Sequence, residues 1–323
     1  MKAKILCAVV SCLLMGLLAG CSSAPAIAPE TAAPVREATP TATVNPTDAP
    51  TAEPVKQATE QTSVPKQQGN ETMTFTMEDH PITYGEKTVF GRLYTPDAEG
   101  KLPAVILSHG FNGTNSDFVK ECRYYAEHGY IAYALDFCGG SGRSKSSGKS
   151  TDMTITSEKQ DLLAVFDHIR SMENVDPERI VVFGGSQGGL VSALAAAELG
   201  DQVRALALYF PAFNIPTDWR AMHPDLNAVE ETFDFWGLRL GKGFVEDVYA
   251  IDVFETIGNY KGDVLIIHGT NDAVVAPSYS QRAVNTYDSA ELILMPGEGH
   301  GFSPAGGESA MEYVLDFMDE HCK

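Results

Sequence analysis

Basic residues are scarce in this chain of 323 residues. Lys and Arg together number 23 against 43 Asp and Glu, which leaves a formal net charge of −20 at pH 7. Binding to nucleic acid needs a cluster of cations against the phosphates, so this composition argues against a nucleic acid partner. It also weakens the case for a strongly anionic polymer as substrate. Solubility outside the cell is a sufficient reason for so much negative charge.

Long apolar runs and closely spaced metal ligands are also missing. The longest apolar stretch, Ile5 to Ala19, is shorter than the roughly 20 residues that span a bilayer. No metal-ligand spacing appears among Cys122, Cys138 and Cys322, so we predict neither a metal nor another cofactor. Cys122, Cys138 and Cys322 are treated as incidental, with one disulfide among them left open, because three cysteines cannot all pair with one another.

The N-terminus has the pattern of an export signal. Lys2 and Lys4 precede the apolar run, as in a signal peptide over residues 1–20. The run ends in Leu18-Ala19-Gly20-Cys21, which resembles a bacterial lipobox. This resemblance implies cleavage before Cys21, a lipid on its sulfur and a membrane-anchored protein on the extracellular face of a bacterial membrane. An ordinary secretion signal is the alternative.

A change of composition separates a tether from the fold. Residues 21–71 contain eight prolines, many Thr and Ala, and no aromatic residue. Such a segment cannot bury enough apolar surface to offset its ordering entropy, so we predict a disordered, extended tether. Residues 72–323 remain, a length that suits one α/β domain.

Apolar runs alternate with helical patterns along residues 72–323. The runs that read as buried strands lie at 104–108, 131–135, 180–183, 203–209 and 264–267. Helical spacing or composition follows at 116–128, 157–172, 187–199, 278–287 and 309–321. This alternation predicts an α/β fold with a mostly parallel central sheet and helices on both faces. Functional residues are then expected on loops at the carboxyl ends of the strands.

The sequence Gly184-Gly185-Ser186-Gln187-Gly188 lies between a predicted strand and a predicted helix. That context turns a common pentapeptide into a nucleophile elbow, a turn so tight that only small residues fit beside the serine. Because an alcohol is a weak nucleophile, this interpretation requires a base and an orienting acid further along the chain.

Both partners are found in the expected order. Asp272 follows the strand at 264–267, and His300 follows the strand at 291–295 in a glycine-rich loop. We predict that Ser186 attacks, that His300 accepts its proton, and that Asp272 orients the imidazole. Asp263 and Glu298 are the other acids considered: the first precedes its strand, and the second shares the loop of His300. Two further histidines, His109 and His268, end buried strands and are interpreted as residues that fix loops.

Acyl transfer also needs donors for the negative oxygen of the transition state. One is predicted to be the backbone N–H of Gln187, directly after the nucleophile. The other is predicted to be the backbone N–H of Phe111, in the loop His109-Gly110-Phe111-Asn112-Gly113, where the small Gly110 allows a close approach.

Four motifs in this order resemble the α/β-hydrolase superfamily. They are His109-Gly110-Phe111, the elbow through Gly189, His268-Gly269-Thr270-Asn271-Asp272 and Gly299-His300-Gly301. Within the superfamily the chain looks most like bacterial carboxylesterases of the cinnamoyl (feruloyl) esterase type, which share an H-G-F-x-G loop, an elbow ending S-Q-G-G-L and a short inserted cap. The loop from Asp136 to Ser144 is similar to their D-x-x-G-x-G-x-S loop. At Gly185 the chain departs from these enzymes, which commonly carry His there.

Residues 211–249 separate two strands by far more than a usual connection. We predict that they form a cap over a substrate pocket, with Phe213, Trp219 and Trp236 as candidate lining residues.

The leading functional hypothesis is a serine hydrolase that cleaves small carboxylic esters, such as feruloyl or acetyl esters of plant material. A serine peptidase on the same fold is the alternative, in which Glu230, Glu231 and Asp234 would hold a substrate amino group. A surface lipoprotein that binds without catalysis is the third.

Overall fold

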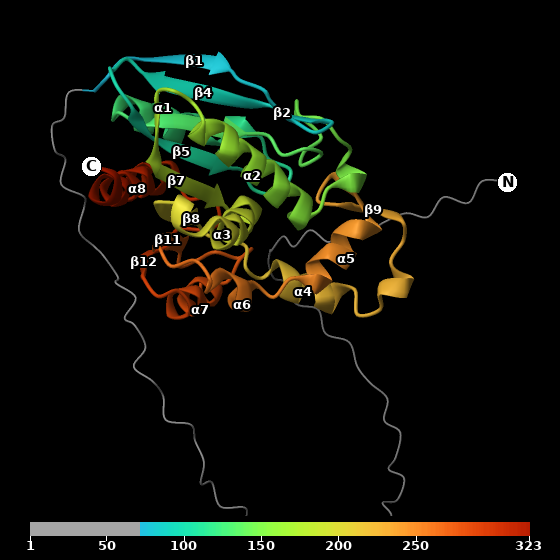
Figure 1. Cartoon of the computed structure of the whole chain (residues 1–323). Coiled ribbons are helices and arrows are strands. Elements are labelled where there is room, and N and C mark those ends of the chain that lie inside the picture. Colours follow the sequence, from blue (N-terminus) through green and yellow to red (C-terminus); the bar gives the residue numbers. More distant parts are fainter. Residues whose placement is uncertain (1–71) are drawn as a thin grey trace, which may run out of the picture. The chain divides into compact units, whose positions relative to one another are not determined.

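The structure is a computed structural model that describes residues 72–323. The predicted signal peptide, Cys21 and the tether lie outside the described residues. An eight-stranded sheet forms the centre of the fold, and its strands run in the order β1-β4-β6-β5-β7-β8-β11-β12 (Figure 1). The strands are β1 (Phe75–Asp79), β4 (Gly91–Pro96), β5 (Leu102–Ser108), β6 (Ile131–Leu135), β7 (Val175–Gly185), β8 (Ala205–Tyr209), β11 (Asp263–Gly269) and β12 (Ala290–Met295).

Six neighbouring strands, from β6 to β12, pair in parallel, and only β1 and β4 pair antiparallel with their neighbours. The prediction of a mostly parallel α/β sheet is confirmed. The parallel strands are buried along almost their whole length, which explains why they read in the sequence as continuous apolar runs.

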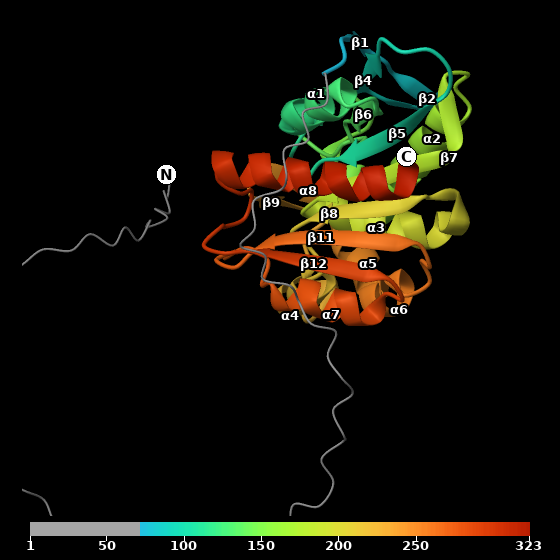
Figure 2. The ribbon, with the colours of Figure 1, turned by 90° about the vertical axis from the view of Figure 1, so that its left-hand side faces the viewer.

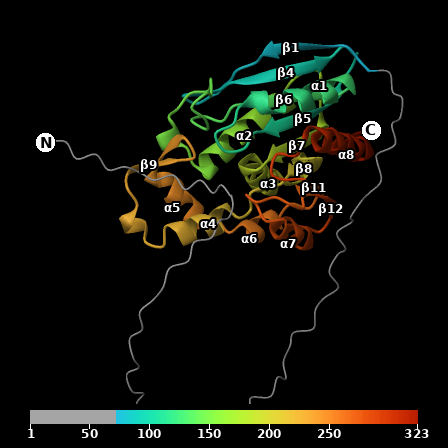
Figure 3. The same ribbon diagram turned by 180° about the vertical axis from the view of Figure 1, so that it is seen from behind.

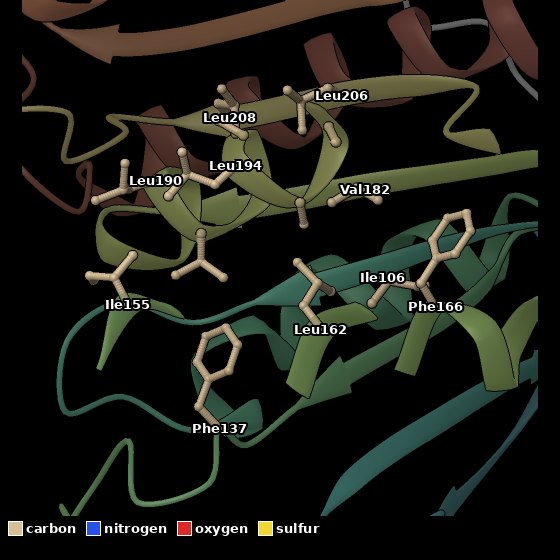
Figure 4. Packing of buried hydrophobic residues seen from close by; sticks show 14 of the residues in the cluster. Ile106, Phe137, Ile155, Leu162, Phe166, Val182, Leu190, Leu194, Leu206 and Leu208 are labelled. Atoms are coloured by element: carbon tan, nitrogen blue, oxygen red, sulfur yellow. The ribbon is translucent and has the colours of Figure 1, made fainter. Parts of the chain in front are cut away.

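Helices cover both faces of the sheet. Helices α1 (Val119–Glu127) and α8 (Pro304–Cys322) pack on one face, and Figure 2 shows α8 lying across it. The other face is covered by α2 (Ile155–Arg170), α3 (Gln187–Leu199), α6 (Val253–Ile257) and α7 (Ser278–Thr286). On that face Leu162 and Phe166 of α2 and Leu190 and Leu194 of α3 meet apolar side chains of the strands, among them Val182 (Figure 4).

The N-terminal part of the fold contains a separate hairpin. It joins β2 (Ile82–Tyr84) to β3 (Lys87–Val89), and the chain then enters β4. The first residue of β4 is glycine because the ring of Tyr133 lies where a side chain at 91 would be, 2.2 Å from a Cβ placed there.

The insertion at 211–249 contains α4 (Ile215–Met222), the hairpin of β9 (Thr232–Phe235) and β10 (Leu238–Gly241), and most of α5 (Lys242–Ala250). Figures 1 and 3 show α4, α5 and β9 together at one end of the sheet. That end is where the carboxyl ends of β5 and β7 lie side by side. After β5 the chain forms β6 on one side of that strand and then crosses to form β7 on its other side. The loops that follow β5 and β7 therefore diverge, and a crevice opens between them.

Cys122, Cys138 and Cys322 are all buried and free, so no disulfide joins them.

Between residues 72 and 323, the structure has no helix with both the length and the apolar character that crossing a membrane requires.

Candidate active site

Ser186 stands at the junction of β7 and α3, with the left-handed backbone angles φ 54° and ψ −121°. The glycines beside it are a steric necessity. A Cβ on Gly184 would lie 2.3 Å from the carbonyl oxygen of Gly188, and a Cβ on Gly188 would lie 2.2 Å from that of Ser108. The turn therefore presents the hydroxyl of Ser186 at the crevice only because neither position bears a side chain.

The structure brings Ser186, His300 and Asp272 together from three separate loops. The Nε2 atom of His300 is 3.0 Å from the hydroxyl oxygen of Ser186, and its Nδ1 atom is 2.8 Å from Oδ2 of Asp272. The ring nitrogens thus connect an alcohol to a buried carboxylate in one continuous hydrogen-bonded line. This is the geometry of a nucleophile, a general base and an orienting acid.

Asp272 is held as a carboxylate by its surroundings. Burial by itself raises the pKa of this carboxyl, but hydrogen bonds from the backbone N–H of Val275, from His300 and from the backbone N–H of Val274 outweigh it and lower the pKa. The two backbone donors reach Oδ1 at 2.8 and 2.9 Å, and His300 reaches Oδ2. Asp272 is therefore ionised, and its negative charge can stabilise an imidazolium ring on His300.

The other two histidines at strand ends hold loops, as predicted. His268 donates from Nε2 to the carbonyl of Val275 at 3.0 Å, with Oδ2 of Asp272 at 3.2 Å, and accepts from Ser280 at Nδ1. His109 donates from Nδ1 to the carbonyl of Gly110 at 2.7 Å and accepts the N–H of Phe137 at Nε2. Burial is the largest influence on both rings and lowers their pKa values, so both are neutral.

The rival acids have other partners. Asp263 begins β11, at the amino ends of the parallel strands and away from the site, and accepts a hydrogen bond from Ser289. Glu298 accepts from both the backbone N–H and the hydroxyl of Ser303, the N-cap of α8. Neither carboxylate contacts the ring of His300 in these pairings, which leaves Asp272 as its acid.

The two predicted oxyanion donors flank the nucleophile. Gln187 is the first residue of α3, so its N–H precedes the first intrahelical hydrogen bond and sits at the positive end of the helix. Phe111 follows Gly110, and a Cβ on Gly110 would be only 3.1 Å from Cβ of Ser186. Phe111, Ser186 and Gln187 all line one cavity. A residue that the sequence did not indicate is Glu158 of α2, which accepts a hydrogen bond from the side chain of Gln187.

Backbone strain is concentrated around this cavity. Five residues other than glycine have a positive φ in the described chain: Asn112, Ser186, Phe210, Trp236 and Phe302. Each lies in or beside the site, since Asn112 follows Phe111 and the rings of Phe210 and His300 are 4.5 Å apart. Left-handed angles cost a residue with a side chain about 1 kcal/mol or more, and such strain gathers where function dictates the backbone.

The cavity has a volume of about 520 Å³ and is mostly apolar. Besides the three residues at the nucleophile, its lining is Ala212, Asn214, Ile215, Asp218, Trp219, Ala221, Met222, Phe235, Trp236, Ala273, Val274 and Val275. Trp219 lines the cavity and is otherwise buried, whereas Trp236 is 66% exposed and stacks on Phe235. The insertion therefore supplies most of the walls.

One predicted pocket residue is wrong. Phe213 is buried in the core against Phe254 and is not part of the cavity lining. Its neighbours Ala212 and Asn214 line the cavity, and the intervening side chain points the opposite way. The acids Glu230, Glu231 and Asp234 are exposed outside the lining as well; the carboxylate that does line the cavity is Asp218.

Comparison with known proteins agrees with this geometry. Residues 116–323 match the model of the prolyl oligopeptidase family, which is more than half of the chain. The chain belongs to the prolyl oligopeptidase family. With the fold and the triad geometry described above, this member of the family is a serine hydrolase of α/β-hydrolase fold.

Relatives of this prolyl oligopeptidase family member include esterases and a peptidase. Est1E from Butyrivibrio proteoclasticus, solved with ferulic acid bound, is 28% identical, with a TM-score of 0.68 over 75% of this chain and 98% of that one. Caffeoylshikimate esterase of Arabidopsis thaliana is 26% identical over 72% of this chain and 82% of its own length. The uncharacterized peptidase YtmA of Bacillus subtilis is 24% identical over 60% and 74%.

At position 185, where this family member has glycine, little room is left for a side chain. A Cβ on Gly185 would lie 3.1 Å from the ring of Phe118 and 3.8 Å from that of Phe210. These two rings fill the space beside the elbow, and Phe210 also packs on the ring of His300. A larger residue at 185 would have to displace Phe118 first.

Proposed function

We propose that this protein is a carboxylesterase that hydrolyses small esters through an acyl-enzyme on Ser186. In the first half of the cycle, the hydroxyl of Ser186 gives its proton to Nε2 of His300 while its oxygen attacks the ester carbonyl. The N–H groups of Gln187 and Phe111 stabilise the oxygen that becomes negative. His300 then protonates the departing alcohol, and in the second half it activates the water that releases the acid.

The observation that supports this proposal most is the position of the cavity. An apolar space of about 520 Å³ opens directly at Ser186, and aromatic side chains of the insertion form its walls. Its size lies within the range of small-molecule pockets. An acyl group with an aromatic ring, such as feruloyl, matches these walls in polarity.

A polar pair in the lining favours acyl groups that carry a hydroxyl. The side chain of Asn214 donates to Oδ2 of Asp218 at 2.7 Å, and this leaves the other oxygen of Asp218 to accept from a ligand. A phenol hydroxyl is a donor of that kind. We therefore expect coumaroyl esters to be cleaved with a lower KM than cinnamoyl esters, which lack only this hydroxyl, and the difference to shrink in Asp218→Ala.

Asp218 also supports the second candidate, a serine peptidase, because a carboxylate at a cavity can hold a substrate amino group. The membership of the prolyl oligopeptidase family and the likeness to YtmA favour it too. Acetyl, butyryl, octanoyl and feruloyl esters assayed beside aminoacyl anilides separate the two. Activity on anilides alone would replace the esterase proposal with the peptidase.

A binding protein without catalysis is tested with a fluorophosphonate, which labels only an activated serine. We expect labelling of the wild type and none of Ser186→Ala. Equal labelling of both would show that Ser186 is not the nucleophile.

Anchoring through Cys21 on the extracellular face of a bacterial membrane also remains a proposal. It is supported by the lipobox-like sequence alone. Incorporation of labelled palmitate during expression, and its loss in Cys21→Ala, is the expected result. Incorporation that survives in Cys21→Ala would refute it.

A further inference from the structure

Glu158 is a carboxyl group in the interior of the protein. It lies in the first part of α2, is 1% exposed, and is not among the residues that line the cavity. Its Oε2 atom accepts a hydrogen bond of 2.8 Å from the side-chain amide of Gln187, which is itself only 2% exposed. A buried acid is thus attached to the residue that directly follows Ser186.

Stability alone does not account for this glutamate. Burial raises the pKa of Glu158 well above its usual value, against the effect of the hydrogen bond from Gln187, and the nearby Asp161 and Asp247 raise it further. Burying such a group costs free energy, and an apolar pair of the same shape is commonly as stable or more so. The contact with Gln187 needs another explanation.

The explanation lies in the peptide that joins residues 186 and 187. Ser186 has left-handed backbone angles, and relaxing them would turn this peptide and with it the N–H of Gln187. Gly188, tight against the carbonyl of Ser108, restrains the chain on one side of Gln187. The bond from the Gln187 side chain to Glu158 restrains it on the other, because α2 packs along α3.

We propose that Glu158 is a positioning residue that holds the side chain of Gln187 and so keeps the Gln187 backbone N–H directed at the oxyanion. Glu158 touches no substrate and acts only through Gln187. The inference rests on the proposed serine-hydrolase mechanism, and it adds a residue of α2 that neither the motifs nor the cavity indicates.

The test is a double-mutant cycle on the full chain. Glu158→Ala and Gln187→Met each remove the same hydrogen bond from one end. We expect each to lower kcat about 10- to 100-fold, less than the loss of a whole oxyanion donor, with KM changed by less than about threefold. In the double variant the second substitution should add almost nothing, since both act on one contact. Glu158→Gln keeps an acceptor for Gln187 and should restore most of the activity.

A control separates positioning from folding. Asp161 is the next buried acid on α2, but it accepts from the N–H of Cys138 and from Tyr84 rather than from Gln187. Asp161→Asn should lower the Tm without lowering kcat per active site. Active sites are counted by complete labelling with a fluorophosphonate. If Glu158→Ala lowers the Tm but leaves kcat per labelled site unchanged, or if the two effects in the cycle simply add, the inference is wrong.

The rate of fluorophosphonate labelling provides a second readout that needs no substrate. The phosphonyl oxygen accepts hydrogen bonds from the same backbone N–H groups as the oxyanion of an ester. We expect the labelling rate to fall in Glu158→Ala and in Gln187→Met alike. A wild type that labels but cleaves no ester would contradict the proposed esterase activity and leave this test intact. Should Glu158→Ala fail to fold, an unchanged labelling rate in Gln187→Met overturns the inference by itself.

Discussion

Replacing Asp272 with asparagine tests the hydrogen-bonded line at the centre of the site. Oδ1 of Asp272 accepts two backbone N–H groups, while Oδ2 faces His300 and His268. An asparagine has one oxygen and one NH₂ group in these places. The oxygen must stay with the two backbone donors, because turning the amide over would give up two hydrogen bonds worth about 1 kcal/mol each and set donor against donor.

The NH₂ group of Asp272→Asn therefore faces Nδ1 of His300 and donates to it. The proton of the neutral imidazole then resides on Nε2, the atom that is 3.0 Å from the hydroxyl of Ser186. A nitrogen that already bears a proton cannot accept another as a neutral base. We expect kcat to fall about 10⁴-fold, equivalent to about 5 kcal/mol of transition-state stabilisation, with little change in KM.

The assay is the hydrolysis of a chromogenic ester, with CD spectra and Tm to show that Asp272→Asn is folded. Glu298→Gln is the matched control, because it changes a carboxylate in the loop of His300 whose partner is Ser303. Its kcat should stay within about threefold of the wild type. If the folded Asp272→Asn variant kept a tenth of the activity or more, the assignment of Asp272 as the orienting acid would have to be abandoned.

Three shorter predictions concern the rest of the molecule. Burial raises the pKa of Glu121 to about 7, so the folded state binds this proton more tightly than the unfolded chain and stability is lost as the pH rises toward and through 7. Glu121→Gln should therefore have a higher Tm than the wild type at pH 8 but nearly the same Tm at pH 4, and equal differences at both would refute this. Gly188→Ala places a Cβ 2.2 Å from the carbonyl oxygen of Ser108, so we expect little soluble protein, whereas Gly243→Ala, where nothing lies within 4 Å, should express normally. Trp236→Ala should raise KM for aryl esters several-fold while changing KM for acetyl esters less than about twofold, because the exposed ring lines the cavity, and equal effects on both would contradict that role.

The elements that the sequence predicted well are those with local causes. Five apolar runs became β5, β6, β7, β8 and β11, since each strand of a parallel sheet is buried on both faces and reads as apolar by itself. The elbow was recognisable because its glycines are required by atoms close along the chain, as with Gly184 and the carbonyl of Gly188. The order of nucleophile, acid and histidine then followed from the strand ends on which they lie.

The insertion shows where such reasoning stops. Its length and its aromatic residues predicted a cap. The direction of each side chain, however, depends on packing against elements far away in sequence. Phe213 turned into the core, and the acid that lines the cavity is Asp218 rather than Glu230, Glu231 or Asp234. No spacing within 211–249 distinguishes these residues.

The sequence by itself determined the α/β class, the strand–turn–helix at Ser186 and the chain order of its two partners, because these depend on periodicity and on turns a few residues long. Only the tertiary structure decided that Phe118 fills the space beside Gly185, that His268 and two backbone N–H groups hold Asp272, and that Glu158 reaches Gln187 across 29 positions. Each of these is a contact between elements distant along the chain, and such a contact exists only once the sheet has aligned them.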